Sequence, residues 1–173
     1  MGLGIRMPRS TCVRPVASSG VAKLWRRLLL LGLLISANQA FAYCWEETAS
    51  RYGIEPELLQ AIAAVESGFR ADAINHANQN GTRDIGLMQI NSIHLPRLLK
   101  LGITEERLLS EPCLSVEVGA SILADFIQRF GYNWTAVGSY NVGAGSGPQR
   151  DALRMRYAEK IWARYELLVQ QRY

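Results

Sequence analysis

The sequence predicts a mainly helical (α) single domain with one small polar loop or β region. Apolar residues recur at helical spacing in several stretches after residue 43. Glycine and proline stand where these stretches end and begin, as they do at helix boundaries. One segment, from Ala71 to Gly86, instead gathers polar residues that favour turns. Because the chain has 173 residues, the simplest organisation is one such domain with an appendage.

The predicted appendage is a signal peptide over residues 1–42. This region contains six basic residues and no acidic one, then an apolar run from Leu28 to Ile35, then Ala40-Phe41-Ala42. A basic region, a short apolar core and a small-x-small site are typical of a secretory signal. We expect cleavage after Ala42 and a periplasmic domain over residues 43–173 without a membrane anchor. A retained anchor is the alternative, although the apolar run is shorter than the roughly 20 residues that span a bilayer.

The net charge of the domain after the predicted signal peptide gives no support for nucleic-acid binding. The chain has 19 basic and 15 acidic residues, and six of the basic ones lie before residue 43. The remaining domain therefore has 13 basic and 15 acidic residues, mixed along the chain without a long run of one sign.

Cysteine usage agrees with export. Cys12 would be lost with the signal, which leaves Cys44 and Cys113 as a pair in an oxidising compartment. We expect them to form a disulfide, and closing a loop of about 70 residues would stabilise the fold by roughly 4 kcal/mol. Two unpaired buried thiols are the alternative. The two cysteines and the two histidines show no metal-ligand spacing, so no metal site is predicted.

The first half of the domain begins with a short helix over Trp45–Tyr52, ended by Gly53. A second helix starts near Pro56, which suits a first helical turn, and ends at Gly68. The polar segment that follows reads as a loop, or as a small hairpin turning at Asn80-Gly81. A helix from Ser92 to Lys100 comes next.

The second half contains the longer helices. Thr104 can cap a short helical turn through Leu109. The segment from Ser115 to Phe130 is apolar on more than one face, which favours a central core helix. Asn133 can cap a helix through Tyr140, the segment from Asn141 to Pro148 is predicted as a loop from its glycines, and a final helix spans about Arg150 to Gln170.

Glu66 lies at the end of the second helix and is a candidate general acid. It is the only ionisable residue between Glu57 and Arg70, on a helix otherwise apolar at Leu58, Leu59, Ile62 and Val65. Partial desolvation would raise the pKa of this carboxyl and let it hold a proton near neutral pH. A solvated glutamate in the last turn is the alternative.

Polar and aromatic side chains elsewhere would suit a sugar polymer. Such a ligand needs aromatic faces for its rings and amides that donate and accept hydrogen bonds at once. The candidates are Gln89, Asn91, Tyr140, Asn141 and Tyr157. Each also has a structural interpretation, because amides can satisfy turn backbone and tyrosines can belong to the core.

Four motifs, taken in order, resemble those of the soluble lytic transglycosylase (SLT) domain family. They are Glu66-Ser67-Gly68-Phe69, Gly86-Leu87-Met88-Gln89-Ile90, Tyr140-Asn141-Val142-Gly143, and Tyr157 in Tyr-Ala-Glu-Lys-Ile. The resemblance covers roughly Cys44 to Tyr165. The small size, the signal, Cys44 and Glu111-Pro112-Cys113 are similar to the subgroup that accompanies secretion and pilus machines. That subgroup includes invasion-associated proteins of type III systems and VirB1-like proteins of type IV systems.

The resemblance implies an α+β, lysozyme-like fold and a monomer that acts on the peptidoglycan glycan strand without a cofactor. By motif position Glu66 would be the catalytic acid/base. Six further residues would line the glycan groove by the same comparison: Ser67, Met88, Gln89, Tyr140, Asn141 and Tyr157.

The implied chemistry is cleavage between N-acetylmuramic acid and N-acetylglucosamine with closure of a 1,6-anhydro ring, one carboxyl serving both proton transfers. Asp84 opens an alternative, because Asp84 to Ser92 also resembles the strand of animal-type lysozyme that carries a second carboxylate. With Asp84 in the site, a lysozyme-type hydrolase becomes the second hypothesis. Asp84 as a plain turn residue, and the whole chain as a non-catalytic wall-binding assembly protein, are the remaining alternatives.

Overall fold

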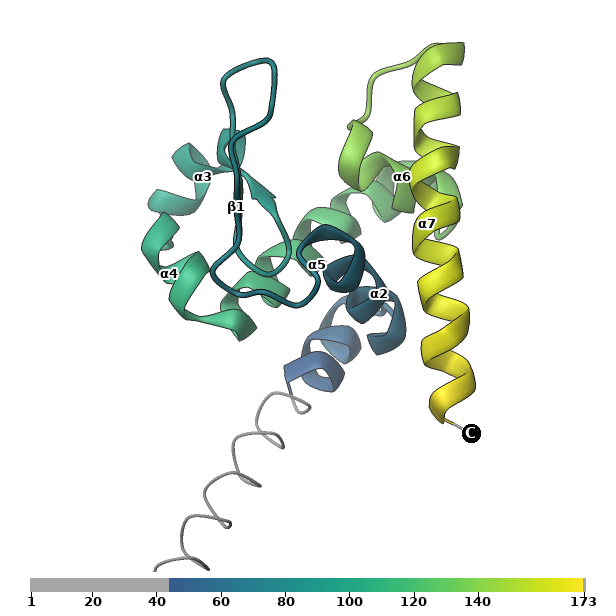
Figure 1. The fold of residues 1–173 in the computed structure, drawn as a ribbon, viewed down its shortest axis with the longest axis horizontal. Coiled ribbons are helices and arrows are strands. Elements are labelled where there is room, and N and C mark those ends of the chain that lie inside the picture. Colours follow the sequence, from purple (N-terminus) through teal and green to yellow (C-terminus); the bar gives the residue numbers. More distant parts are fainter. Residues whose placement is uncertain (1–43, 173) are drawn as a thin grey trace, which may run out of the picture. The chain divides into compact units, whose positions relative to one another are not determined.

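Helices dominate the computed structural model, which describes residues 44–172 (Figure 1). The predicted signal peptide lies outside the described residues. After a first helix over residues 44–52, the elements are α2 (Pro56–Glu66), β1 (Ile74–Asn75), β2 (Asp84–Ile85), β3 (Ile90–Asn91), the 3-10 helix η1 (Ser92–His94), α3 (Leu95–Leu99), α4 (Glu105–Ser110), α5 (Pro112–Phe130), α6 (Trp134–Val142) and α7 (Pro148–Arg172). Helices with one small sheet confirm the predicted fold class. Within residues 44–172, no helix has the length and apolar character needed to cross a membrane.

Helix α2 carries the Glu66 carboxyl at its last position. Pro56 occupies the first turn, as predicted, and Leu59, Ile62 and Ala63 are fully buried. Beyond Glu66, Gly68 and Phe69 both adopt a left-handed conformation, with φ of 62°. The chain therefore leaves the helix immediately after Glu66, and the carboxyl stands at the edge of the core.

Helix α5 is the central core helix that its apolar pattern predicts. Val116, Ala120 and Leu123 on it are fully buried. Gly119 brings its backbone against the turn that precedes β3, because a Cβ at this position would lie 2.9 Å from the Cβ of Met88. This close approach fixes the turn 86–89 on the core.

Helices α6 and α7 lie side by side, and α7 also packs along α2 (Figure 1). Gly138 permits the close contact, since a Cβ there would lie 2.5 Å from the carbonyl oxygen of Arg154. This packing brings the end of α2, the end of α6 and the middle of α7 together.

Four of the predicted helices differ in extent from those of the structure. Helix α5 begins at Pro112 and α7 at Pro148, because a proline suits the first helical turn, where its missing N–H has no partner to lose. Helix α6 continues to Val142 before Gly143 ends it, so Asn141 is helical and not part of a loop. The single helix expected over residues 92–100 is divided into η1 and α3, with Pro96 in the first turn of α3.

The polar segment forms the hairpin that its turn residues suggested. Strands β1, β2 and β3 make an antiparallel sheet in that order. In the register, Asp84 stands opposite Asn75 on one side and Asn91 on the other.

The predicted disulfide is confirmed. Cys44 in the first helix is bonded to Cys113 in α5, with their Cα atoms 5.7 Å apart. It links two helices separated by 69 residues of sequence.

Candidate active site

A polar cleft lies between the small sheet and the ends of α2 and α6. Its lining residues come from the sheet and hairpin, from η1, and from helices α2, α5 and α6: Glu66, Asn78, Asp84, Gln89, Ile90, Asn91, His94, Ile122, Tyr140 and Asn141. Six residues predicted from the sequence are thus brought together: Glu66, Asp84, Gln89, Asn91, Tyr140 and Asn141. Both carboxyl groups of the cleft belong to this set.

Glu66 meets the predicted requirement for a general acid. Burial at the end of the apolar helix raises the pKa of its carboxyl from 4.5 to about 7, opposed by a hydrogen bond from Tyr157. The nearby negative charge of Asp84 raises this pKa further, and Lys160 lowers it. A carboxyl with a pKa near 7 is populated in both protonation states at neutral pH, so it can give and then take a proton.

Tyr157 orients this carboxyl. Its hydroxyl, on α7, donates a hydrogen bond of 2.6 Å to Oε1 of Glu66. The tyrosine is 7% exposed, and burial raises the pKa of its hydroxyl well above the usual value. It therefore stays protonated and remains a donor to Glu66, which lines the cleft.

Asp84 is held in a different way. Its Oδ1 accepts a hydrogen bond from Asn91 Nδ2 at 2.7 Å, and its Oδ2 accepts from Asn78 Nδ2 at 3.0 Å and Asn75 Nδ2 at 3.3 Å. The strand register supplies two of these donors, since Asn75 and Asn91 are its cross-strand partners. Asp84 is therefore a strand residue held by amide side chains, which corrects its interpretation as a turn residue bonded to nearby backbone amides.

Tyr140 and Gln89 shape the floor of the cleft. The Tyr140 hydroxyl donates to the carbonyl oxygen of Met88 at 2.9 Å, and burial raises the pKa of this hydroxyl. Gln89 has a φ of 48°, rare for a residue other than glycine, and its Nε2 donates to the carbonyl oxygens of Gly86 and Ala73. Both side chains therefore fix the turn before β3 while lining the cleft.

The remaining predicted residues differ in how far their side chains are exposed to solvent. Asn141, in the last turn of α6, is exposed and lines the cleft. Ser67 is buried, and its hydroxyl donates to the carbonyl oxygens of Leu87 and Ala63 at 2.7 and 3.2 Å. Met88 is fully buried against Gly119. Ser67 and Met88 thus support the cleft from beneath, and their side chains do not line it.

Comparison with known proteins assigns the chain to a family. The model of the transglycosylase SLT domain matches residues 43–164, which is most of the chain. The chain belongs to the transglycosylase SLT domain family. Its enzyme class is accordingly that of the lytic transglycosylases.

Several known proteins are similar to this chain in sequence, and one solved structure is similar in fold. Invasion protein IagB of Salmonella typhimurium (strain LT2) is 53% identical over 135 residues, covering 78% of this chain and 82% of the relative. Protein IpgF of Shigella flexneri is 48% identical over 139 residues, covering 80% and 90%. The fold is similar to that of an inactive mutant of the lytic transglycosylase Slt from Pseudomonas aeruginosa, with a TM-score of 0.58 and 18% identity. That match covers 75% of this chain and 24% of the longer enzyme.

Two polar residues that line the cleft were not predicted from the sequence as site residues: Asn78 and His94. Asn78 holds Asp84, and His94 lines the cleft from η1, where burial lowers the pKa of its imidazole. Asn78 lies among other turn-forming residues in the sequence, and only the folded hairpin shows that its amide faces Asp84. The sequence around His94 contains no motif that would place its imidazole in a cleft.

Proposed function

We propose that this SLT-family protein cleaves the β-1,4 bond between N-acetylmuramic acid and N-acetylglucosamine in peptidoglycan, with Glu66 as its single acid/base. The observation that carries the proposal is the Glu66 carboxyl in a polar cleft, with a pKa raised to about 7 and one oxygen held by Tyr157. A second group for the same proton transfers is unnecessary, because one such carboxyl can serve as acid and then as base.

In the first step, protonated Glu66 donates its proton to the oxygen that bridges the two sugars. The bond from C1 of N-acetylmuramic acid to that oxygen breaks, and N-acetylglucosamine leaves with a free hydroxyl. The substrate's own N-acetyl oxygen stabilises the cationic C1. In the second step, ionised Glu66 takes the proton of the C6 hydroxyl, whose oxygen bonds to C1 and closes the 1,6-anhydro ring. The proton returns to Glu66, and no water is consumed.

The other cleft residues receive binding and positioning roles in this proposal. Asn141 is exposed at the cleft and offers both a donor and an acceptor to a sugar. Tyr140 and Gln89 line the surface on which the glycan lies. Ser67 and Met88 contribute through the backbone that they hold in place, because their side chains are buried.

A lysozyme-type hydrolase is the second candidate, and Asp84 is the observation that favours it. The Asp84 carboxylate lines the same cleft as Glu66 and is fixed by three amide donors. A fixed carboxylate beside the cleaved bond can stabilise a cationic sugar or serve as nucleophile while water completes the reaction. The single-carboxyl proposal predicts instead that Asp84 only modulates the pKa of Glu66.

For the cellular role, we propose that the exported protein acts as a monomer in the periplasm and opens the wall locally for a secretion or pilus apparatus. Support comes from the predicted signal peptide and from the similarity to a protein named for invasion. A secretion-competent strain carrying Glu66→Gln should then export less through its apparatus. Export that stays at the wild-type level would contradict this role.

The decisive experiment on catalysis compares Glu66→Gln with Glu106→Gln, an exposed carboxyl on α4 outside the cleft. Glu66→Gln keeps an acceptor for Tyr157 but cannot transfer a proton, so clearing of purified peptidoglycan should fall about a thousandfold. Sedimentation with wall material should persist in both variants. Clearing by Glu66→Gln at the rate of the control would mean that Glu66 is not the acid/base, and the non-catalytic wall-binding alternative predicts no clearing by wild type.

A further inference from the structure

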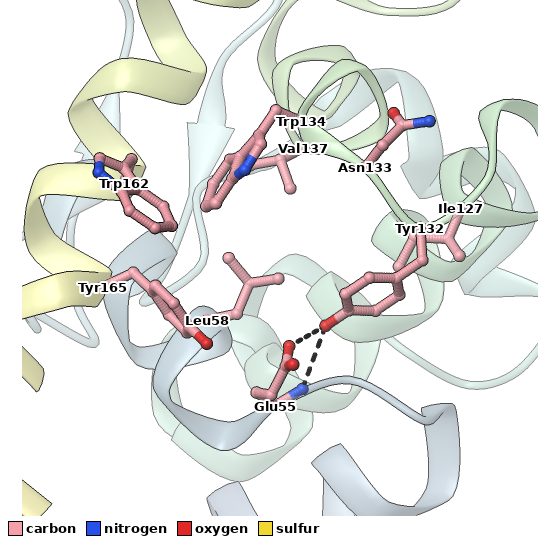
Figure 2. Close-up of a pocket in the computed structure, with 9 residues that line it drawn as sticks. All are labelled: Glu55, Leu58, Ile127, Tyr132, Asn133, Trp134, Val137, Trp162 and Tyr165. Carbon is pink, nitrogen blue, oxygen red and sulfur yellow. Dashed lines mark hydrogen bonds between the residues drawn. The ribbon is translucent and has the colours of Figure 1, made fainter. Parts of the chain in front are cut away.

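Figure 2 shows a second hollow of the molecule. Its lining includes Glu55, which stands at the N-cap position of α2, whereas Glu66 stands at the end of that helix. The hollow is built from the start of α2, the start of α6 and the second half of α7, with Glu55, Leu58, Trp134, Trp162 and Tyr165 among its lining residues. It shares no lining residue with the catalytic cleft. Since a helix rises about 1.5 Å per residue, the 11 residues from Glu55 to Glu66 separate the two sites by roughly 16 Å.

Four of the nine residues that line this hollow are aromatic. The centroids of Trp134 and Trp162 are 5.1 Å apart with perpendicular rings, and Tyr165 lies 6.3 Å from Trp134 and 5.9 Å from Trp162. Figure 2 shows these three rings on one side of the hollow and Tyr132 on the other, with Leu58 between them. Trp162 is 43% and Tyr132 50% exposed, so part of the aromatic surface is accessible to a ligand.

The charged residues in the lining of this hollow and of a neighbouring one are Glu55 and Glu159, both acidic. Glu55 lines the hollow, and its carboxylate accepts a hydrogen bond from the Tyr132 hydroxyl. A neighbouring hollow shares Trp134 and Trp162 and is completed by Met155, Ala158 and Glu159. Neither hollow has a lysine or arginine in its lining.

The polar groups of the hollow are poorly suited to a sugar. Asn133 is the only amide side chain in the lining, and it is already committed to the backbone. Its Oδ1 accepts from the N–H groups of Thr135 and Ala136, and its Nδ2 donates to the carbonyl oxygen of Phe130. Sugar hydroxyls would therefore meet aromatic rings without the amide partners that the catalytic cleft provides.

We propose that the two hollows around Trp134 and Trp162 bind a lysine or arginine side chain, flanked by apolar residues, of a protein partner. Tryptophan and tyrosine faces attract cations, and a nearby carboxylate adds a complementary charge. Met155 and Ala158 offer an apolar surface beside the shared tryptophans for the flanking residues. The site would attach the enzyme to its partner while leaving the catalytic cleft open, and it does not depend on the reaction proposed for Glu66.

Binding of model peptides to the purified protein tests this site. The probe is acetyl-Leu-Lys-Leu-amide, and the matched control carries norleucine, which has an uncharged side chain of similar shape, in place of lysine. The readout is the shift of the indole N–H signals of Trp134 and Trp162 in a two-dimensional NMR spectrum. We expect the lysine peptide to shift both signals and to bind more tightly than the norleucine peptide. Equal or tighter binding of the norleucine peptide, absence of these shifts, or the same shifts with tri-N-acetylglucosamine would overturn the proposal.

Two variants locate the binding and report on different parts of the site. Trp162→Ala and Glu55→Gln should each weaken binding of the lysine peptide about two- to fivefold, the size of one exposed cation–π contact or ion pair. Leu153→Ala, an exposed apolar residue on α7 outside both hollows, is the matched control and should bind like wild type. All three should clear peptidoglycan at the wild-type rate, which shows that they fold. Wild-type affinity of both Trp162→Ala and Glu55→Gln would contradict the assignment.

Discussion

Glu66 and Asp84 line the same cleft, but their surroundings differ. Glu66 ends an apolar helix, is half-buried, and receives one hydrogen bond from a tyrosine. Asp84 lies in a strand and accepts hydrogen bonds from three asparagines. Desolvation disfavours a charge, whereas donated hydrogen bonds stabilise one. The surroundings of Glu66 therefore favour proton exchange, whereas the surroundings of Asp84 hold its carboxylate in place as a hydrogen-bond acceptor.

The largest effect expected from this difference is on stability. Because the folded pKa of Glu66, about 7, exceeds its ordinary value of 4.5, the folded state binds the proton more tightly than the unfolded state. The contribution of this group is fully present below pH 4.5 and is lost as the pH rises through about 7, a loss of about 3 kcal/mol.

Urea unfolding of Glu66→Gln measures this cost. The variant should match wild type near pH 4 and exceed its free energy of unfolding by about 3 kcal/mol near pH 8. Glu106→Gln should follow the wild-type curve. A pH-independent difference between Glu66→Gln and wild type would show that burial does not raise this pKa.

The next effect concerns the amides around Asp84. Asn91 donates to Asp84 and to Thr82 Oγ1, and its Oδ1 caps η1 by accepting from the N–H of Ile93. Asn91→Ala should lower the free energy of unfolding by about 2 kcal/mol, from a lost cap and a lost charge-assisted hydrogen bond. Activity of the folded fraction should stay within a few-fold of wild type. A loss as large as that of Glu66→Gln would place Asp84 in the reaction.

Tyr157→Phe removes the hydroxyl that favours ionised Glu66, so the pKa of Glu66 should rise. A lost hydrogen bond to a charged group costs about 1.5 kcal/mol, so peptidoglycan clearing should fall about tenfold at neutral pH, where Glu66 must ionise for the second step. The pH–activity profile should move to higher pH. A profile that moves to lower pH would contradict the assigned hydrogen bond.

Asp84→Asn is expected to have the smallest effect and the opposite sign. Removing its negative charge should lower the pKa of Glu66 and move the pH–activity profile to lower pH. Clearing at the optimum should stay within about threefold of wild type, because the substitution keeps one amide-bonded oxygen and removes no proton-transfer group. A thousandfold loss of peptidoglycan clearing would show that Asp84 takes part in the reaction, as the two-carboxylate hydrolase alternative requires.

Local patterns in the sequence predicted the fold and the position of Glu66, because apolar spacing and helix ends are set by neighbouring residues. Contacts between distant segments could not be read in this way. Tyr157 reaches Glu66 across 91 residues only because α7 packs along α2. Asn75 and Asn78 face Asp84 because of strand register and hairpin geometry. Ser67 and Met88 belong to the motifs, yet both side chains are buried in the structure. A sequence motif can contain residues that stabilise the fold as well as residues that contact a ligand.

The most direct test of a single acid/base is the chemistry of the product. Peptidoglycan is digested by the purified protein in ¹⁸O-labelled water, and the fragments are analysed by mass spectrometry. If Glu66 performs both proton transfers, every new end is a 1,6-anhydro ring, one water lighter than a reducing end, and carries no label. Reducing ends that contain ¹⁸O would show that water attacks the sugar, and the single-carboxyl account would be wrong.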